Sequence, residues 1–155
     1  MRDCTQFYID GQWVDPVEEN TVAVENPATE QTIGHISFGT AADVDKAVVA
    51  ARRAFESFSQ TSKEERLTLL RAIQAEIETR KEELATAVSD EMGAPLSLAN
   101  GPHVGLLAGH CQKAIEVLEG FAFERLDGPT LHVWEPVGVV GMITPWNWPL
   151  NQIAC

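Results

Sequence analysis

A run of apolar residues near the end of the chain limits the choice of fold more than any other feature. Residues 137–143 consist only of valine, glycine, methionine and isoleucine. Because apolar and polar residues do not alternate, the run is typical of a strand with both faces buried in a parallel sheet. Pro145 ends the strand, and we expect a helix to begin at Asn147 or Trp148. The sequence therefore predicts an α/β protein, since a parallel sheet needs helices on its faces.

The first forty residues contain the short alternating runs of β-strands. Strands are expected at residues 7–9, 12–14, 21–25 and 32–38. Asp10 and Gly11 separate the first two strands and strongly favour a tight hairpin. Asn26 and Pro27 suit a turn between the other two strands. We therefore predict a β-arm at the start of the chain.

Helical patterns follow the strands. Thr40 and Ser62 each lie three positions before an acid, Asp43 and Glu65 respectively, which is the capping-box pattern of a helix start. Apolar residues then recur at steps of three and four. One amphipathic helix is expected up to residue 58, and a second helical stretch is expected to follow the Ser62 cap.

The second helical stretch ends at Gly93, and its pattern allows either one helix or two. Gly101 and Pro102 should break or kink the next helix, which then extends to about Phe123. A strand is expected at residues 130–135, with Pro136 at its end.

Composition and charge narrow the classes of function. The 155 residues are 45% hydrophobic and 22% charged, which suits one globular domain. The net charge of −12 disfavours nucleic acid and anionic membranes as partners. The start of the chain lacks the apolar core of a signal peptide, so a cytoplasmic location is expected. Three scattered cysteines indicate reduced thiols rather than a disulfide framework.

Chemistry is expected where the buried strand passes into the following helix. In open parallel sheets, ligands bind beyond the carboxyl ends of the strands, where N–H groups at helix starts point outward. Asn147 lies there, and its neutral amide can donate a hydrogen bond to a developing oxyanion. Trp146 offers a flat apolar face to a ring or a ribose. A purely structural interpretation also fits, with Asn147 as a helix cap and both Trp146 and Trp148 in the core.

Four short motifs occur along the chain in a specific order. They are Tyr8-Ile9-Asp10-Gly11-Gln12-Trp13, Asn26-Pro27-Ala28-Thr29, Glu91-Met92-Gly93-Ala94-Pro95-Leu96 and Pro145-Trp146-Asn147-Trp148-Pro149-Leu150. In this order they resemble the aldehyde dehydrogenase superfamily over the whole chain. Two positions depart from the family pattern: Trp148 replaces the usual phenylalanine or tyrosine, and Ala94 replaces a frequent lysine.

The resemblance implies that the chain is the N-terminal third of an NAD(P)-dependent aldehyde dehydrogenase with a truncated form of that fold. Residues 1–129 would belong to the coenzyme-binding domain, and residues 130–136 would form the strand of an oligomerisation arm. Residues 137–155 would supply the first buried strand and the helix start of a Rossmann-like core. The catalytic domain is expected to be absent.

The resemblance also implies roles for individual residues. Asn147 would donate its amide to the oxyanion of a cysteine thiohemiacetal, and Trp148 would line the tunnel of a small-molecule aldehyde. Contacts with NAD or NADP are implied for Ile143, Thr144, Pro145 and Trp146. Because the family's nucleophilic cysteine and general-base glutamate lie beyond the matched region, the isolated chain is expected to be inactive. The full-length protein is expected to be a homodimer or homotetramer.

Two other functions remain open at this point. CoA-acylating and acyl-phosphate-reducing relatives share much of the architecture, and the residues that distinguish them lie downstream. A non-catalytic helical interaction module would also fit the helical middle of the chain.

No metal site is expected. About 10 Å of helix separates His103 from His110, which is too far for both to ligate one ion. Cys155 is expected on a buried apolar helix face, where thiols are usually inert. In some relatives a monovalent cation lies at positions matching Val24, Glu25 and Glu91, but these residues make only a weak signature here.

Overall fold

The N-terminal hairpin forms as the sequence predicts. The structure is a computed structural model that describes residues 2–155. Strands β2 (Phe7–Ile9) and β3 (Gln12–Val14) pair antiparallel. Asp10 and Gly11 between them have positive φ angles of 56° and 78°, the conformation that two-residue hairpin turns require. The hairpin prediction is confirmed.

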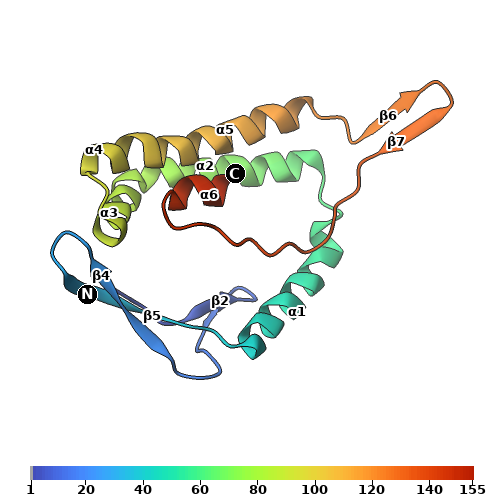
Figure 1. Ribbon diagram of the computed structural model, residues 1–155. Coiled ribbons are helices and arrows are strands. Elements are labelled where there is room, and N and C mark those ends of the chain that lie inside the picture. The colour runs from blue at the N-terminus through green and yellow to red at the C-terminus, as the bar shows by residue number, and fades with distance from the viewer. Residues whose placement is uncertain (1) are drawn as a thin grey trace.

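A three-stranded sheet lies beside this hairpin, at the blue end of the chain in Figure 1. Strands β4 (Thr21–Asn26) and β5 (Gln31–Ser37) pair antiparallel, close to the predicted ranges. Strand β1 (Arg2–Cys4) pairs parallel to the other edge of β5, and the order is β1-β5-β4. The sequence did not predict β1, because three residues are too few to show a period of two.

Helix α1 (Ala41–Phe58) begins with the predicted capping box, in which Thr40 and Asp43 bond reciprocally. Its predicted apolar stripe is not buried, however: Val44 is 59% exposed and Phe58 is 54% exposed. The reason is that α1 packs mainly against β2 and runs obliquely away from the layer formed by α2 and α5 (Figure 1). Periodicity predicted the helix correctly but not a partner for its apolar face.

The long central stretch forms two helices, which settles the alternative left open by the sequence. Helix α2 (Lys63–Thr79) starts at the Ser62 capping box, and α3 (Lys81–Met92) ends at Gly93 in the left-handed conformation. Arg80 separates the two helices with φ −108° and ψ 14°.

The expected break at Gly101 and Pro102 takes the form of a π turn. A short helix α4 (Leu96–Leu98) leads into η1 (Ala99–His103), which continues as α5 (Val104–Gly120). Pro102 has no N–H to donate, and the Val104 N–H reaches back to the carbonyl of Ala99, five residues earlier. Helix α5 ends at Gly120, before the predicted end at Phe123.

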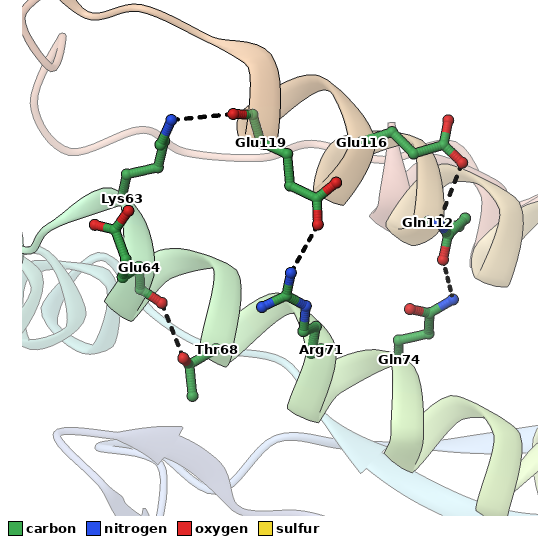
Figure 2. Close-up of polar contacts among 8 residues, drawn as sticks. All are labelled: Lys63, Glu64, Thr68, Arg71, Gln74, Gln112, Glu116 and Glu119. Atoms are coloured by element: carbon green, nitrogen blue, oxygen red, sulfur yellow. Dashed lines mark hydrogen bonds and ion pairs between the residues drawn. The ribbon is translucent and has the colours of Figure 1, made fainter.

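The core lies between α2, α3, α5 and the last helix, α6 (Pro149–Ala154). Its buried apolar residues are Leu67, Ile77, Ala85, Val88, Ala94, Ala99, Val104, Cys111, Ile115 and Leu150. Polar contacts continue this packing at the surface, where α2 and α5 run side by side (Figure 2). Arg71 donates to a carboxylate oxygen of Glu119 at 2.7 Å, and Gln74 donates to Gln112 at 2.8 Å. Such exposed pairs add little stability, so apolar packing holds the helices together.

A second hairpin extends from the end of α5 away from the helices (Figure 1). It consists of β6 (Glu124–Asp127) and β7 (Thr130–Val133). Strand β7 confirms most of the strand predicted at residues 130–135. The sequence did not predict β6, because its four residues include a single apolar one, Leu126, and show no alternation.

The buried strand predicted at residues 137–143 is not formed within the described residues. These residues form no strand, and Val137 and Ile143 are 92% and 100% exposed. A strand needs a neighbour to satisfy its backbone groups, and none of the strands within residues 2–155 lies beside this segment. The Rossmann-like parallel sheet expected from the apolar run is therefore not formed by the described residues.

Candidate functional site

The predicted site residues lie together in the segment that leads into α6. Ile143, Thr144, Pro145 and Asn147 are all exposed, and Trp146 is 79% exposed. No backbone hydrogen bond among residues 2–155 involves residues 143–146. Their backbone groups and the indole face of Trp146 are therefore available to a ligand. The alternative that placed Trp146 in the core is wrong.

Asn147 is not the cap of the last helix. Helix α6 begins at Pro149, its cap position is Trp148, and no side chain caps it. Proline at the first helical position explains this start, because its fixed φ suits a helix and its missing N–H needs no partner there. The plain-cap interpretation of Asn147 is therefore wrong, and within residues 2–155 its side-chain amide makes no hydrogen bond.

Trp148 is half-buried and lies flat against His103. The two ring centroids are 4.3 Å apart, and the planes differ by 17°. His103 comes from the π turn, 45 positions earlier in the chain. Both residues were noted from the sequence, but a contact between positions so far apart in the chain produces no local sequence pattern.

Trp146 lines a hollow between the N-terminal sheet and the helices. The volume of this hollow is about 520 Å³, and Pro149, Leu150 and Met92 form part of its apolar wall. Glu25 and Glu91, two of the three residues matched to a cation site, also line it. No group of three or more histidine, cysteine, aspartate or glutamate side chains within residues 2–155 is arranged to hold a metal. The weak cation signature at Val24, Glu25 and Glu91 is not tested by this arrangement.

Cys155 lies differently from the prediction. It is exposed just beyond α6, and its Sγ is 3.5 Å from Nε2 of His110, which is 3.0 Å from the Asn151 side-chain oxygen. The buried position expected for it is therefore wrong. Cys111 is the buried thiol of this region, and it donates to the carbonyl of Leu70.

The carboxyls with a clearly lowered pKa lie away from this segment. Backbone and side-chain hydrogen bonds from Thr40 and Ser62 lower the pKa values of Asp43 and Glu65 at two helix starts. Arg80 lowers the pKa of Glu83 through a hydrogen bond and its charge. These shifts arise from capping and from surface pairing, so they do not indicate acid–base catalysis by these groups.

Similarity to known proteins identifies the family to which this geometry belongs. The sequence pattern of the aldehyde dehydrogenase family matches residues 13–155. The chain is 51% identical to a 3-succinoylsemialdehyde-pyridine dehydrogenase of Pseudomonas over 99% of its own length and 32% of the relative's. It is 47% identical to a putative aldehyde dehydrogenase of Staphylococcus aureus, again over 99% of this chain and 32% of the other.

Solved structures agree in fold. An aldehyde dehydrogenase from Bartonella henselae superposes with a TM-score of 0.96 at 36% identity, covering 99% of this chain and 33% of that one. A mutant aldehyde dehydrogenase C from Pseudomonas syringae, crystallised with NAD+ and octanal, superposes with a TM-score of 0.95 at 48% identity, covering 97% and 31%.

The helical layer, the two hairpins and the exposed turn before α6 thus define a chain with the N-terminal architecture of an aldehyde dehydrogenase. The chain belongs to the aldehyde dehydrogenase family. It spans about a third of the length of the curated relatives it matches. Within residues 2–155, none of the helices combines the length and the apolar composition that a bilayer crossing requires.

Proposed function

We propose that this chain is the N-terminal part of an enzyme that oxidises an aldehyde to a carboxylic acid with NAD or NADP. Family membership and the activities for which the relatives are named support this assignment. The structural observation that carries it is the free amide of Asn147, exposed in the turn before α6. A preorganised neutral donor suits an oxyanion that develops when a thiol attacks an aldehyde.

In this proposal Asn147 holds and polarises the aldehyde oxygen. Its amide donates a hydrogen bond that strengthens as negative charge develops on that oxygen in the thiohemiacetal. The attacking cysteine and the general base are supplied by residues outside this chain. Asn147 therefore lowers the barrier without exchanging a proton.

Residues 143–146 suit a nicotinamide coenzyme. The backbone groups of Ile143 and Thr144 have no partner among residues 2–155, and the exposed face of Trp146 is flat and apolar. Pro145 keeps this turn from continuing as a regular element. When bound, the coenzyme supplies the hydride acceptor, and these residues orient it beside the aldehyde.

Trp148 is the residue of this chain that we assign to the aldehyde tunnel. Its larger ring, in place of the family's usual phenylalanine or tyrosine, narrows the space available to a substrate. The full protein is proposed to be a homodimer or homotetramer in the cytoplasm. The hairpin β6–β7 is its proposed bridging arm, because it extends away from the helical core (Figure 1).

The role of Asn147 is tested in the natural protein that contains this chain. We expect Asn147→Ala to lower kcat for aldehyde oxidation by about 10²-fold or more, with a small change in the Kd of the coenzyme. Asn20→Ala is the matched control, because Asn20 is another exposed asparagine and directly precedes β4 in the N-terminal sheet. An unchanged kcat in Asn147→Ala would remove this residue from the mechanism. If the natural protein oxidised no aldehyde with either coenzyme, the proposed reaction itself would be overturned.

A further inference from the structure

His103 is the most completely buried large side chain of the described residues. Its relative exposure is 1%, and its Nδ1 has no hydrogen-bond partner among residues 2–155. A buried polar atom without a partner is unfavourable, and an apolar side chain of similar size would avoid this cost. A flat ring at this position, in place of an aliphatic side chain, therefore needs a reason other than filling the core.

The local fold places His103 against the turn that carries the proposed site. It is the last residue of the π turn η1, and η1 contacts both α3 and α6. A π turn contains one residue more than an α turn, and such turns are frequent at functional sites. Here the turn brings the imidazole face to the indole of Trp148, with centroids 4.3 Å apart.

Buried Leu150 and the contact between Asn151 and His110 anchor α6 against α5, but they lie beyond the Trp148 ring. No side chain caps the helix, and the cap position is occupied by Trp148 itself, with φ −140° and ψ 61°. Asn147 immediately precedes it. Among the described residues, the stack on His103 is the aromatic contact of the Trp148 ring, and it lies next to Asn147 in the chain.

We propose that His103 is a positioning residue that sets the orientation of Trp148 and thereby the aldehyde preference of the enzyme. The inference rests on the proposed function, because it assigns Trp148 to the substrate path. A flat ring is the property that matters, since only a flat side chain can lie parallel to the indole over its whole face. His103 does not contact the substrate itself.

Two substitutions separate the flat ring from the buried volume. In the natural protein, His103→Leu fills the space without a flat face, and His103→Phe keeps the flat face without the nitrogens. We expect His103→Leu to change the ratio of kcat/KM for a long-chain and a short-chain aldehyde by about tenfold, a size typical of altered apolar pockets. His103→Phe should retain the ratio of the unmodified protein, and KM for the coenzyme should stay the same in both variants.

A spectroscopic measurement on the same variants does not depend on turnover. The protein is labelled with 5-fluorotryptophan, and the ¹⁹F resonance of Trp148 is assigned by its loss in Trp148→Phe. We expect His103→Leu to move this resonance beyond its linewidth, because the neighbouring ring is lost, and His103→Phe to leave it broadly in place. Trp13, exposed in the N-terminal hairpin, serves as the internal control resonance.

The two measurements give distinct results. A Trp148 resonance that does not move in His103→Leu overturns the positioning role. A moved resonance with an unchanged aldehyde ratio overturns the link to specificity, and so does the same altered ratio in both variants. If the unmodified protein oxidises no aldehyde, the proposed function fails and the specificity role fails with it. The ¹⁹F result still decides in that case whether His103 positions Trp148.

Discussion

At the scale of single residues, Asp43 joins two parts of the fold. One carboxylate oxygen accepts hydrogen bonds from the backbone N–H and the hydroxyl of Thr40, both at 2.9 Å. The other accepts from the backbone N–H of Val17, also at 2.9 Å. These donors favour the ionised carboxylate and hold the pKa of Asp43 below its ordinary value, against the opposing effect of burial. The sequence predicted the bonds to Thr40, but it gave no sign of the bond to Val17.

This lowered pKa makes the contribution of Asp43 to stability dependent on pH. Because the pKa is lower in the folded than in the unfolded chain, the contribution is present above about pH 4 and is lost as the pH falls through the folded-state pKa. We expect Asp43→Asn to lower Tm by about 2–4 °C at pH 7, as for a lost helix cap, and the difference should shrink toward pH 3. Thermal unfolding followed by circular dichroism measures both values.

Asp45→Asn is the matched control, because Asp45 is an exposed acid on the same helix. Its Tm should stay within about 1 °C of the unmodified chain at both pH values. If Asp43→Asn and the unmodified chain differed equally at pH 7 and pH 3, the ionised carboxylate would not be the source of the stability.

At the scale of elements, two glycines on neighbouring helices should respond to alanine in opposite directions. Gly93 ends α3 with φ +78°, and a Cβ there would lie 2.7 Å from Cγ of Pro27 in the β4–β5 turn. Gly109 lies inside α5 in a helical conformation, and a Cβ there would meet nothing within 4 Å. The first glycine is required by its backbone angle and a close contact, and the second only weakens its helix.

We expect Gly93→Ala to lower the free energy of unfolding by about 1–2 kcal/mol, from the left-handed conformation alone. Gly109→Ala should raise it by about 0.5–1 kcal/mol, because alanine loses less backbone entropy in a helix. Urea denaturation of the two variants beside the unmodified chain measures both changes. Effects of the same sign would show that the space and the backbone angles around these glycines do not control stability.

The elements that could be predicted from the sequence are those set by neighbouring residues. The capping boxes at Thr40 and Ser62, the turn at Asp10 and the break at Pro102 all depend on contacts within a few positions. Strand β1 and the exposed stripe of α1 depend on partners far along the chain, and local periodicity cannot identify such partners.

In the candidate site, too, the sequence predicts what neighbouring residues determine and misses what depends on distant residues. Asn147 and its neighbours were found because they form a contiguous motif, and the structure places them together in one exposed turn. The stack of His103 on Trp148 joins two distant segments, so only the structure reveals it. The apolar run at residues 137–143 forms no strand for a related reason, since it has the pattern of a buried strand but no neighbouring strand among the described residues.

At the scale of the whole molecule, the exposed apolar surface and the net charge have opposite effects on self-association of the chain. Met142, Ile143 and Trp146 are exposed by 74%, 100% and 79%, within a segment whose backbone is unpaired. Such a segment favours pairing with a second copy of this chain, both by apolar burial and by strand addition. The net charge of −12 opposes this association by repulsion, which salt screens beyond about 10 Å at 0.1 M.

We therefore expect the 155-residue chain to self-associate at micromolar concentration, and more strongly in 0.3 M salt than in 0.03 M salt. Sedimentation velocity over a tenfold range of protein concentration measures the effect. Val140→Lys combined with Ile143→Lys should shift the chain toward monomer, because the two charges lie within the exposed segment. Val117→Lys, a comparably exposed position on α5, should not. If the double variant and Val117→Lys responded equally, residues 137–146 would not form the contact between copies. If the unmodified chain were a monomer at both salt concentrations, charge repulsion would outweigh the exposed apolar surface even when salt screens it.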